Sequence, residues 1–374
     1  MKIKSILFTV ALICTTGISA QTGGIQSVLE QIEANSPELA ALKKQAEAVK
    51  AGSRTGIYLP DPAVEFNFLW GTPASMGNRT DLNVMQSFDF PTAYYYKRKI
   101  AAGKATQADL QYAVERKALL LQARRTCIEL VYRNALQAEL DRRLLHAGRI
   151  ADACRAKFDK GETDILEQNR AQLNLLNVRK EAGQNAIERE TLSAELARLN
   201  GGNAVVLDDA AFDAVLLPAD FEEWYARAES ANPALQQLSQ EIEISRRQVQ
   251  LDKARWLPGF SAGYRSERIA GTTLQGIGVG ISIPLWEKRH TVKAAKAQTA
   301  ALQSSETAAR AQFYSTLEIQ FAKAQSLRRL TDDYKQSLRA VSSVELLQTA
   351  LDKGQISLIE YIMEQTVYYE AAGR

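Results

Sequence analysis

The sequence predicts a mostly α-helical fold with four β-strands, built from one unit that occurs twice in the chain. The first observation is the stretch from Pro284 to Gly354, which has no glycine or proline between its ends and is typical of one very long helix. The second is a matching stretch from Pro91 to Gly161, which also ends in Asp-Lys-Gly. Both stretches span 70 residues, and they lie 193 residues apart at either end, which indicates a duplicated unit.

Residues 1–20 have the pattern of a signal peptide. Lys2 and Lys4 precede a short apolar run, and the small residue Ala20 stands before Gln21, where signal peptidase is expected to cut. Cys14 follows the bulky Ile13, whereas a lipidated cysteine follows a small residue, so lipidation is not expected. The mature chain is therefore expected to begin at Gln21.

The charge and cysteine content exclude two classes of protein. Loss of the signal peptide removes two of 46 basic residues and none of 43 acidic ones, so the mature chain is almost neutral and nucleic acid is not an expected partner. Cys127 and Cys154 lie on one predicted helix at a separation of roughly 40 Å, which is too far for a disulfide. No mature stretch has 18 apolar residues in a row, so a membrane-embedded part would have to be made of strands.

The first repeat is predicted to cover residues 21–202. Val28, Leu29 and Ile32 have the spacing of one helix face, and Ser36 followed by Pro37 is a helix start. The expected order after these two helices is a strand hairpin at 63–90, a long helix at 94–158 and a return helix at 164–199. Residues 203–220 are expected to form a small linker appendage between the repeats.

The second repeat is predicted to cover residues 221–374 in the same order. It begins with two helices and continues with a strand hairpin at 260–285, a long helix at 287–352 and a return helix at 357–374. Only 20 residues follow Gly354, so the second return helix is expected to be a truncated copy of the first.

All four predicted strands alternate between apolar residues and Gly, Ser, Asn, Asp or Arg. This alternation is typical of outer-membrane barrel strands, which have lipid on one side and water on the other. The alternative interpretation is an amphipathic sheet that packs on helices. Four large aromatic residues near the strand ends favour the membrane and are candidate interface residues, namely Trp70, Phe90, Trp256 and Trp286.

Four strands cannot close a barrel, since about eight is the smallest closed number, and open sheet edges are not tolerated in lipid. The chain is therefore expected to associate with copies of itself. Two copies would give eight strands and a packed interior, whereas three would give twelve strands and a pore. The small residues on the polar face favour the pore.

The order of these elements resembles the TolC family of outer-membrane efflux proteins over essentially the whole mature chain. The resemblance rests on four motifs, namely Leu59-Pro60-Asp61-Pro62, Phe88-Asp89-Phe90-Pro91 before Lys97-Arg98-Lys99, Ile281-Ser282-Ile283-Pro284-Leu285, and the two Asp-Lys-Gly turns. The Leu59-Pro60-Asp61-Pro62 stretch is most similar to that of the family branch that works with heavy-metal pumps.

The resemblance implies a homotrimer with one twelve-stranded β-barrel in the outer membrane of a Gram-negative bacterium and an α-helical barrel in the periplasm. It also implies a periplasmic adaptor and an inner-membrane pump of the RND type as partners. It implies neither an enzyme nor a cofactor or metal site.

The resemblance also assigns candidate site residues. The two turns are expected to dock on the adaptor through Asp159, Lys160, Gly161, Asp352, Lys353 and Gly354. Glu360 is expected at the channel constriction, where the further candidates are Met363, Glu364 and the repeat counterpart Glu167. The alternative is structural, because Asp164-x-x-Glu167 and Ser357-x-x-Glu360 both fit a helix capping box and each glycine suits the end of a helix.

No catalytic constellation is predicted, since His146 and His290 have no spacing that places them together. The expected function is a passive efflux channel for small molecules or metal ions. A protein-secretion outlet of the same family remains open, as does a non-conducting periplasmic coiled-coil tether. The strand glycines Gly276, Gly278 and Gly280 favour a channel over a tether, because a tether has no use for a smooth lumen.

Overall fold

The computed structural model describes residues 24–212, 216–340 and 344–372, so the predicted signal peptide lies outside the described residues. The chain divides into two compact units. The first comprises the described parts of Met1–Ser36 and Gln122–Asp213, and the second those of Pro37–Leu121 and Ala214–Arg374. The boundary between the units passes through the first predicted repeat.

The first unit contains α1 (Ile25–Asn35), the second half of α3 (Pro91–Asp159) and α4 (Ile165–Leu199). Its core comes from helix faces with apolar residues three and four positions apart. Val28, Leu29 and Ile32, which have the spacing of one helix face, are buried on α1. Cys127 and Cys154 of α3 are also buried, and both are free thiols.

The segment that follows α4 is held by a buried asparagine on α3. The side-chain nitrogen of Asn134 donates hydrogen bonds to the carbonyl oxygens of Leu207 and Asp209, at 2.9 and 3.1 Å. Its side-chain oxygen accepts a 2.8 Å hydrogen bond from Arg189 of α4. The first half of the predicted linker appendage is therefore attached to α3, and Arg189 of α4 holds the asparagine that attaches it.

The helices of the second unit include α2 (Pro37–Ser53), the first part of α3, α5 (Phe221–Ser230) and α6 (Pro233–Ala254). The Asn232 side chain caps α6 by accepting a 2.9 Å hydrogen bond from the backbone of Ala234. Helix α3 approaches α6 closely at Gly103, where a Cβ atom would lie 2.8 Å from the Ile244 side chain. This close approach explains a glycine inside a long helix.

The second long helix differs from its prediction at its start. It was expected at 287–352, but α7 (Thr291–Ala340) begins four residues later, after a turn in which Arg289 donates to the carbonyl of Trp286 at 3.0 Å. His290 closes this turn with φ of +68°. At the other end, residues 341–343 lie outside the described residues, and α8 (Val344–Asp352) follows them.

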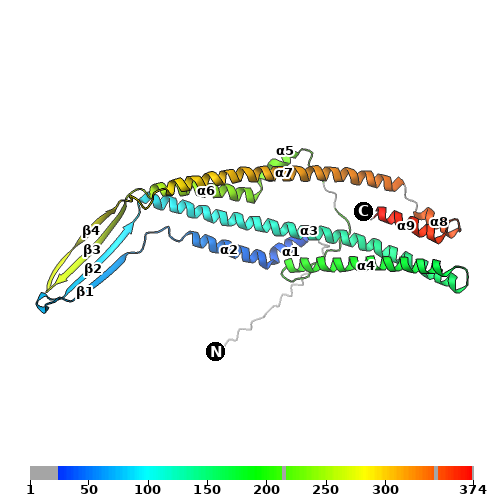
Figure 1. Ribbon diagram of the computed structural model, residues 1–374, viewed down its shortest axis with the longest axis horizontal. Helices are drawn as coiled ribbons and strands as arrows, with labels where there is room; N and C mark the ends of the chain where they lie inside the picture. Colours follow the sequence, from blue (N-terminus) through cyan, green and yellow to red (C-terminus); the bar gives the residue numbers. More distant parts are fainter. Residues whose placement is uncertain (1–23, 213–215, 341–343, 373–374) are drawn as a thin grey trace, which may run out of the picture. The chain divides into compact units, whose positions relative to one another are not determined.

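Helices α5 and α6 both pack on α7 (Figure 1). Phe221 and Tyr225 of α5 meet the Tyr314 ring of α7 edge to face, with ring centres 5.3 and 4.9 Å apart. The Tyr314 hydroxyl also donates a 2.7 Å hydrogen bond to the Glu222 carboxylate, which raises the pKa of Tyr314 to about 12. The last helix, α9 (Leu358–Ala372), packs on α8.

The second unit also contains an antiparallel sheet in the order β1-β2-β3-β4 (Figure 1). Its strands are β1 (Ala63–Leu69), β2 (Arg79–Phe88), β3 (Gly259–Ile269) and β4 (Thr272–Ser282), and the short helix η1 (Ala74–Met76) lies in the first loop. Strands β1 and β4 are the two edges. The predicted fold class, with long helices and two strand hairpins, is confirmed. None of the described helices is both long enough and apolar enough to cross a membrane.

Candidate functional site

The strand register gathers the apolar residues on one face of the sheet. Val64, Val84, Tyr264 and Ile277 are paired in a continuous row across the four strands. Because side chains alternate between faces along a strand, the residues two positions away share this face. Exposure is nearly complete on the β4 edge, where Ile277 is 89% exposed and Val279 is 86% exposed. Such an apolar face needs an apolar environment.

The opposite face is polar and lined with small residues. One row across it contains Glu65, Asn83, Arg265 and Gly276. A Cβ atom at Gly276 would meet no atom within 4 Å, so this glycine leaves space in front of the sheet. The two faces therefore have the chemistry that a wall between lipid and water requires.

The four candidate interface aromatics lie at the two ends of the strands. Trp70 directly follows β1 at the loop end of the sheet and is 80% exposed. Phe90, Trp256 and Trp286 lie at the opposite end, where strands connect to helices. The Phe90 ring packs against Phe260 with ring centres 6.3 Å apart, whereas Trp286 is 78% exposed.

The first Asp-Lys-Gly turn connects α3 with α4. Gly161 has φ of +74°, a conformation that favours glycine, and its N–H donates to the carbonyl of Phe158 at 2.8 Å. Asp164 then caps α4, since its side chain accepts a 2.8 Å hydrogen bond from the backbone of Glu167. The carboxylate of Glu167 accepts a hydrogen bond from the Thr163 hydroxyl, so the reciprocal partner in the predicted capping box is Thr163.

The second Asp-Lys-Gly turn, between α8 and α9, repeats this geometry. Gly354 has φ of +67°, and its N–H donates to the carbonyl of Leu351 at 3.0 Å. The capping box at the start of α9 is complete. The backbone of Glu360 donates to the Ser357 hydroxyl at 3.2 Å, and the backbone of Ser357 donates to the Glu360 carboxylate at 2.8 Å.

These contacts determine the electrostatics of Glu360. The hydrogen bond from the Ser357 backbone, with a second from its hydroxyl at 2.9 Å, lowers the pKa of Glu360 below its ordinary value. Met363 and Glu364 are exposed on the next turn of α9. Glu167 is half-buried on α4 in the first unit. The structure thus shows the capping role of Glu360 and leaves the side chain ionised.

A cluster of polar side chains inside the α8–α9 hairpin was not predicted. Tyr361 is almost completely buried, and its hydroxyl donates a 2.9 Å hydrogen bond to Gln348 while accepting one of 3.1 Å from Gln365. Burial raises the pKa of Tyr361 to about 12. The residue follows Glu360 directly, so this cluster fixes how α9 leaves the turn. Its spacing of 13 residues from Gln348 has no local sequence signal.

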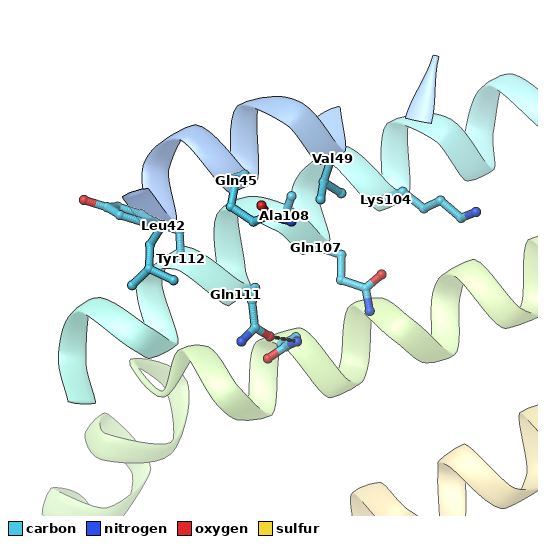
Figure 2. A pocket seen from close by; sticks show the side chains of 10 residues that line it. Leu42, Gln45, Val49, Lys104, Gln107, Ala108, Gln111 and Tyr112 are labelled. Atoms are coloured by element: carbon cyan, nitrogen blue, oxygen red, sulfur yellow. Dashed lines mark hydrogen bonds between the residues drawn. The ribbon is translucent and has the colours of Figure 1, made fainter. Parts of the chain in front are cut away.

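A groove of about 340 Å³ lies between α2 and α3 (Figure 2). Leu42, Gln45 and Val49 come from α2, and Ala108 and Tyr112 from α3. Gln237 of α6 closes one side by donating a 2.5 Å hydrogen bond to Gln111. Lys104 also lines the groove, and its lining includes no carboxylate, histidine or cysteine.

Across residues 24–212, 216–340 and 344–372, no three His, Cys, Asp or Glu side chains gather in a way that could hold a metal ion.

Comparisons with known proteins complete this description. No protein-family model matches the sequence, and no curated protein sequence matches it. Among solved structures, the chain is similar to the outer-membrane channel CmeC of Campylobacter jejuni, with 15% identity and a TM-score of 0.70 over 93% of this chain and 81% of that one. The chain has the fold of an outer-membrane channel.

Two further structures agree. The outer-membrane protein VceC of Vibrio cholerae is 14% identical, with a TM-score of 0.71 over 93% of this chain and 90% of VceC. CusC, which is described as forming a transmembrane channel, is 12% identical, with a TM-score of 0.74 over 93% of this chain and 87% of CusC. At these identities the likeness concerns the fold, which is the one that the family resemblance predicted.

Proposed function

We propose that the chain is one subunit of a passive efflux channel in the outer membrane of a Gram-negative bacterium. The observation that carries the proposal is the four-stranded sheet, with its exposed apolar face, its polar opposite face and its two edges β1 and β4. Each unpaired backbone group would cost several kcal/mol in lipid. Closing the sheet with copies of the same chain removes both edges.

Three copies account for the polar face better than two. Eight strands enclose a space that side chains fill, and such an interior would be packed with large residues. Gly276 and Gly278 of β4 instead leave space in front of the sheet. We therefore propose a homotrimer with a twelve-stranded barrel around a water-filled lumen.

The helical hairpins are then on the periplasmic side. We propose that the turns at Gly161 and Gly354 dock on a periplasmic adaptor, which connects the channel to an inner-membrane pump of the RND type. Both turns are exposed, and each is held by backbone hydrogen bonds to the preceding helix. The channel performs no chemistry in this proposal, and the pump supplies the energy and selects the cargo.

Single-channel recording from the purified protein in planar bilayers tests the proposal. A channel gives discrete conductance steps, whereas a coiled-coil tether gives none, and the second result would refute it. In the same experiment, Glu360→Gln should reduce the preference for cations if the Glu360 carboxylates of three copies form a ring. Unchanged selectivity would leave Glu360 with its capping role alone.

A second experiment tests the docking turn. Gly354→Pro imposes a negative φ where the backbone has +67°, so it should abolish export while trimers remain in the membrane. The matched control is Gly183→Ala in α4, where the added Cβ meets no atom within 4 Å and export should persist. Export by Gly354→Pro would contradict docking through this turn.

A further inference from the structure

Four chain segments connect the sheet to the helices, and the strand register places them at one end of the sheet. Ala63, the first residue of β1, pairs near the end of β2 with Met85. Phe88 ends β2 opposite Phe260, and Ser282 ends β4 opposite Gly259. We call the segments 50–62, 88–99, 250–259 and 283–296, which extend from these strand ends into the adjacent helices, the junction.

The junction is strongly basic. It contains eleven Lys and Arg residues and four Asp and Glu residues. The opposite end of the sheet, residues 69–81 and 265–275, contains three arginines and two acids. There Arg79 pairs with both acids, Asp81 at 2.9 Å and Glu267 at 3.3 Å. The excess of positive charge is thus seven at the helix end of the strands and one at the opposite end.

Most of this charge is not neutralised within the chain. Lys97 pairs with Asp89 at 2.9 Å, Lys288 pairs with Glu287, and Arg255 lies 3.8 Å from Asp252. Seven further cations are exposed and form no ion pair with another described residue, namely Arg54, Arg98, Lys99, Lys253, Arg289, Lys293 and Lys296. An exposed cluster of this kind is suited to an external anion.

Exposed apolar side chains are interleaved with these cations. Tyr58, Tyr95, Trp256, Leu285 and Trp286 are all exposed in the junction. Aromatic side chains are favoured at the boundary between hydrocarbon and water, and Lys and Arg are favoured where the leaflet carries phosphate. The combination indicates a surface that contacts lipid headgroups, since a free anion would need no apolar neighbours.

The strand length places the junction at this boundary. Strands β3 and β4 have 11 residues each. At about 3.3 Å per residue and a tilt of about 45°, they span roughly 25 Å, which is the height of the apolar band of a membrane barrel. The junction therefore lies at headgroup level on the helix side of the membrane.

We propose that the junction binds the headgroups of anionic phospholipids in the leaflet that faces the helices. This inference rests on the proposed membrane channel. Arg98 and Arg289 are the principal donors, because a guanidinium can bind two phosphate oxygens at once. Arg98 lies in the first turns of α3 and Arg289 lies just before α7, so the two arginines come from different segments of the junction.

Native mass spectrometry of trimers extracted from vesicles tests this proposal. The vesicles contain phosphatidylethanolamine, with or without phosphatidylglycerol. The variant is Arg98→Gln/Arg289→Gln. The control is Arg328→Gln/Arg329→Gln, which removes two exposed arginines of α7 about 55 Å along the helix from its start.

The wild-type protein should retain phosphatidylglycerol preferentially. Each lost cation should weaken the retention of phosphatidylglycerol about fivefold. The junction variant lacks two cations at the site on each subunit, so its retention of this lipid should fall about 25-fold, while that of the control is unchanged. Equal retention of the two lipids by the wild type, or an equal loss in the control, would overturn the proposal. So would displacement of the lipid by inorganic phosphate, because the site would then bind a free anion.

Conductance of the same preparations separates this inference from the proposed function. Channels that conduct without retaining phosphatidylglycerol would overturn the lipid site alone. Absence of conductance in every preparation would overturn the channel itself. Conductance by the junction variant also shows that the variant is folded and inserted, so that a loss of lipid retention is attributable to the two arginines.

Discussion

Asn134→Ala is expected to detach the segment after α4 from the first unit. The wild-type side chain makes three hydrogen bonds, two to the carbonyl oxygens of Leu207 and Asp209 and one from Arg189. The asparagine itself is only 8% exposed. Only the two bonds to Leu207 and Asp209 hold the segment, and at about 1 kcal/mol for each neutral bond their loss is about 2 kcal/mol. This corresponds to roughly a thirtyfold shift in the equilibrium between the attached and the detached segment.

Hydrogen exchange followed by mass spectrometry measures this shift directly. Amides in peptides covering residues 203–212 should exchange about thirtyfold faster in the variant, while those of α1 keep their protection. The control is Asn169→Ala on the exposed face of α4, which should leave the segment unchanged. Unaltered protection in Asn134→Ala would refute the view that this side chain attaches the segment.

Two further perturbations follow from burial and close packing. Burial raises the pKa of the Cys127 thiol to about 11, so the unfolded state loses this proton first as pH rises from 9 to 11. The free energy of unfolding should fall by about 2 kcal/mol over that range, and Cys127→Val should not show this fall. At Gly263 an added Cβ would lie 2.4 Å from a backbone oxygen of β2. Gly263→Ala should therefore lower the yield of heat-resistant trimers on gels, whereas Gly276→Ala should not.

The strands and turns could be predicted because their signals are local. Alternation along Val64, Phe66 and Phe68 sets which side chains share a face, and the register confirms the four-stranded sheet. The Ser357-x-x-Glu360 spacing likewise contains both partners of the capping box within one helical turn. In such cases three or four residues suffice to determine the contact.

Contacts between distant residues could not be predicted in this way. Asn134 binds carbonyl groups 73 and 75 residues further along the chain, and no periodicity marks such a residue. The late start of α7 has a related cause. His290 adopts a positive φ although it is not glycine, so the sequence contained none of the turn residues that usually indicate this conformation.

The central claim is that copies of this chain join edge to edge, and the internal repeat predicts how. Within the chain, Gln86 of β2 pairs with Ala262 of β3. Aligning Pro91 with Pro284 relates Gln86 to Val279, and aligning Pro60 with Pro258 relates Ala262 to Val64. The repeat therefore predicts that Val279 of one copy lies opposite Val64 of the next.

Disulfide cross-linking in membranes tests this prediction most directly. The variant carries Val64→Cys and Val279→Cys in a chain in which the two native mature cysteines are replaced by valine. After oxidation, a ladder of bands should end at the trimer, and either single-cysteine chain should stay monomeric on a denaturing gel. A ladder that ends at the dimer, or no cross-link at all, would contradict the account of three copies sharing one barrel.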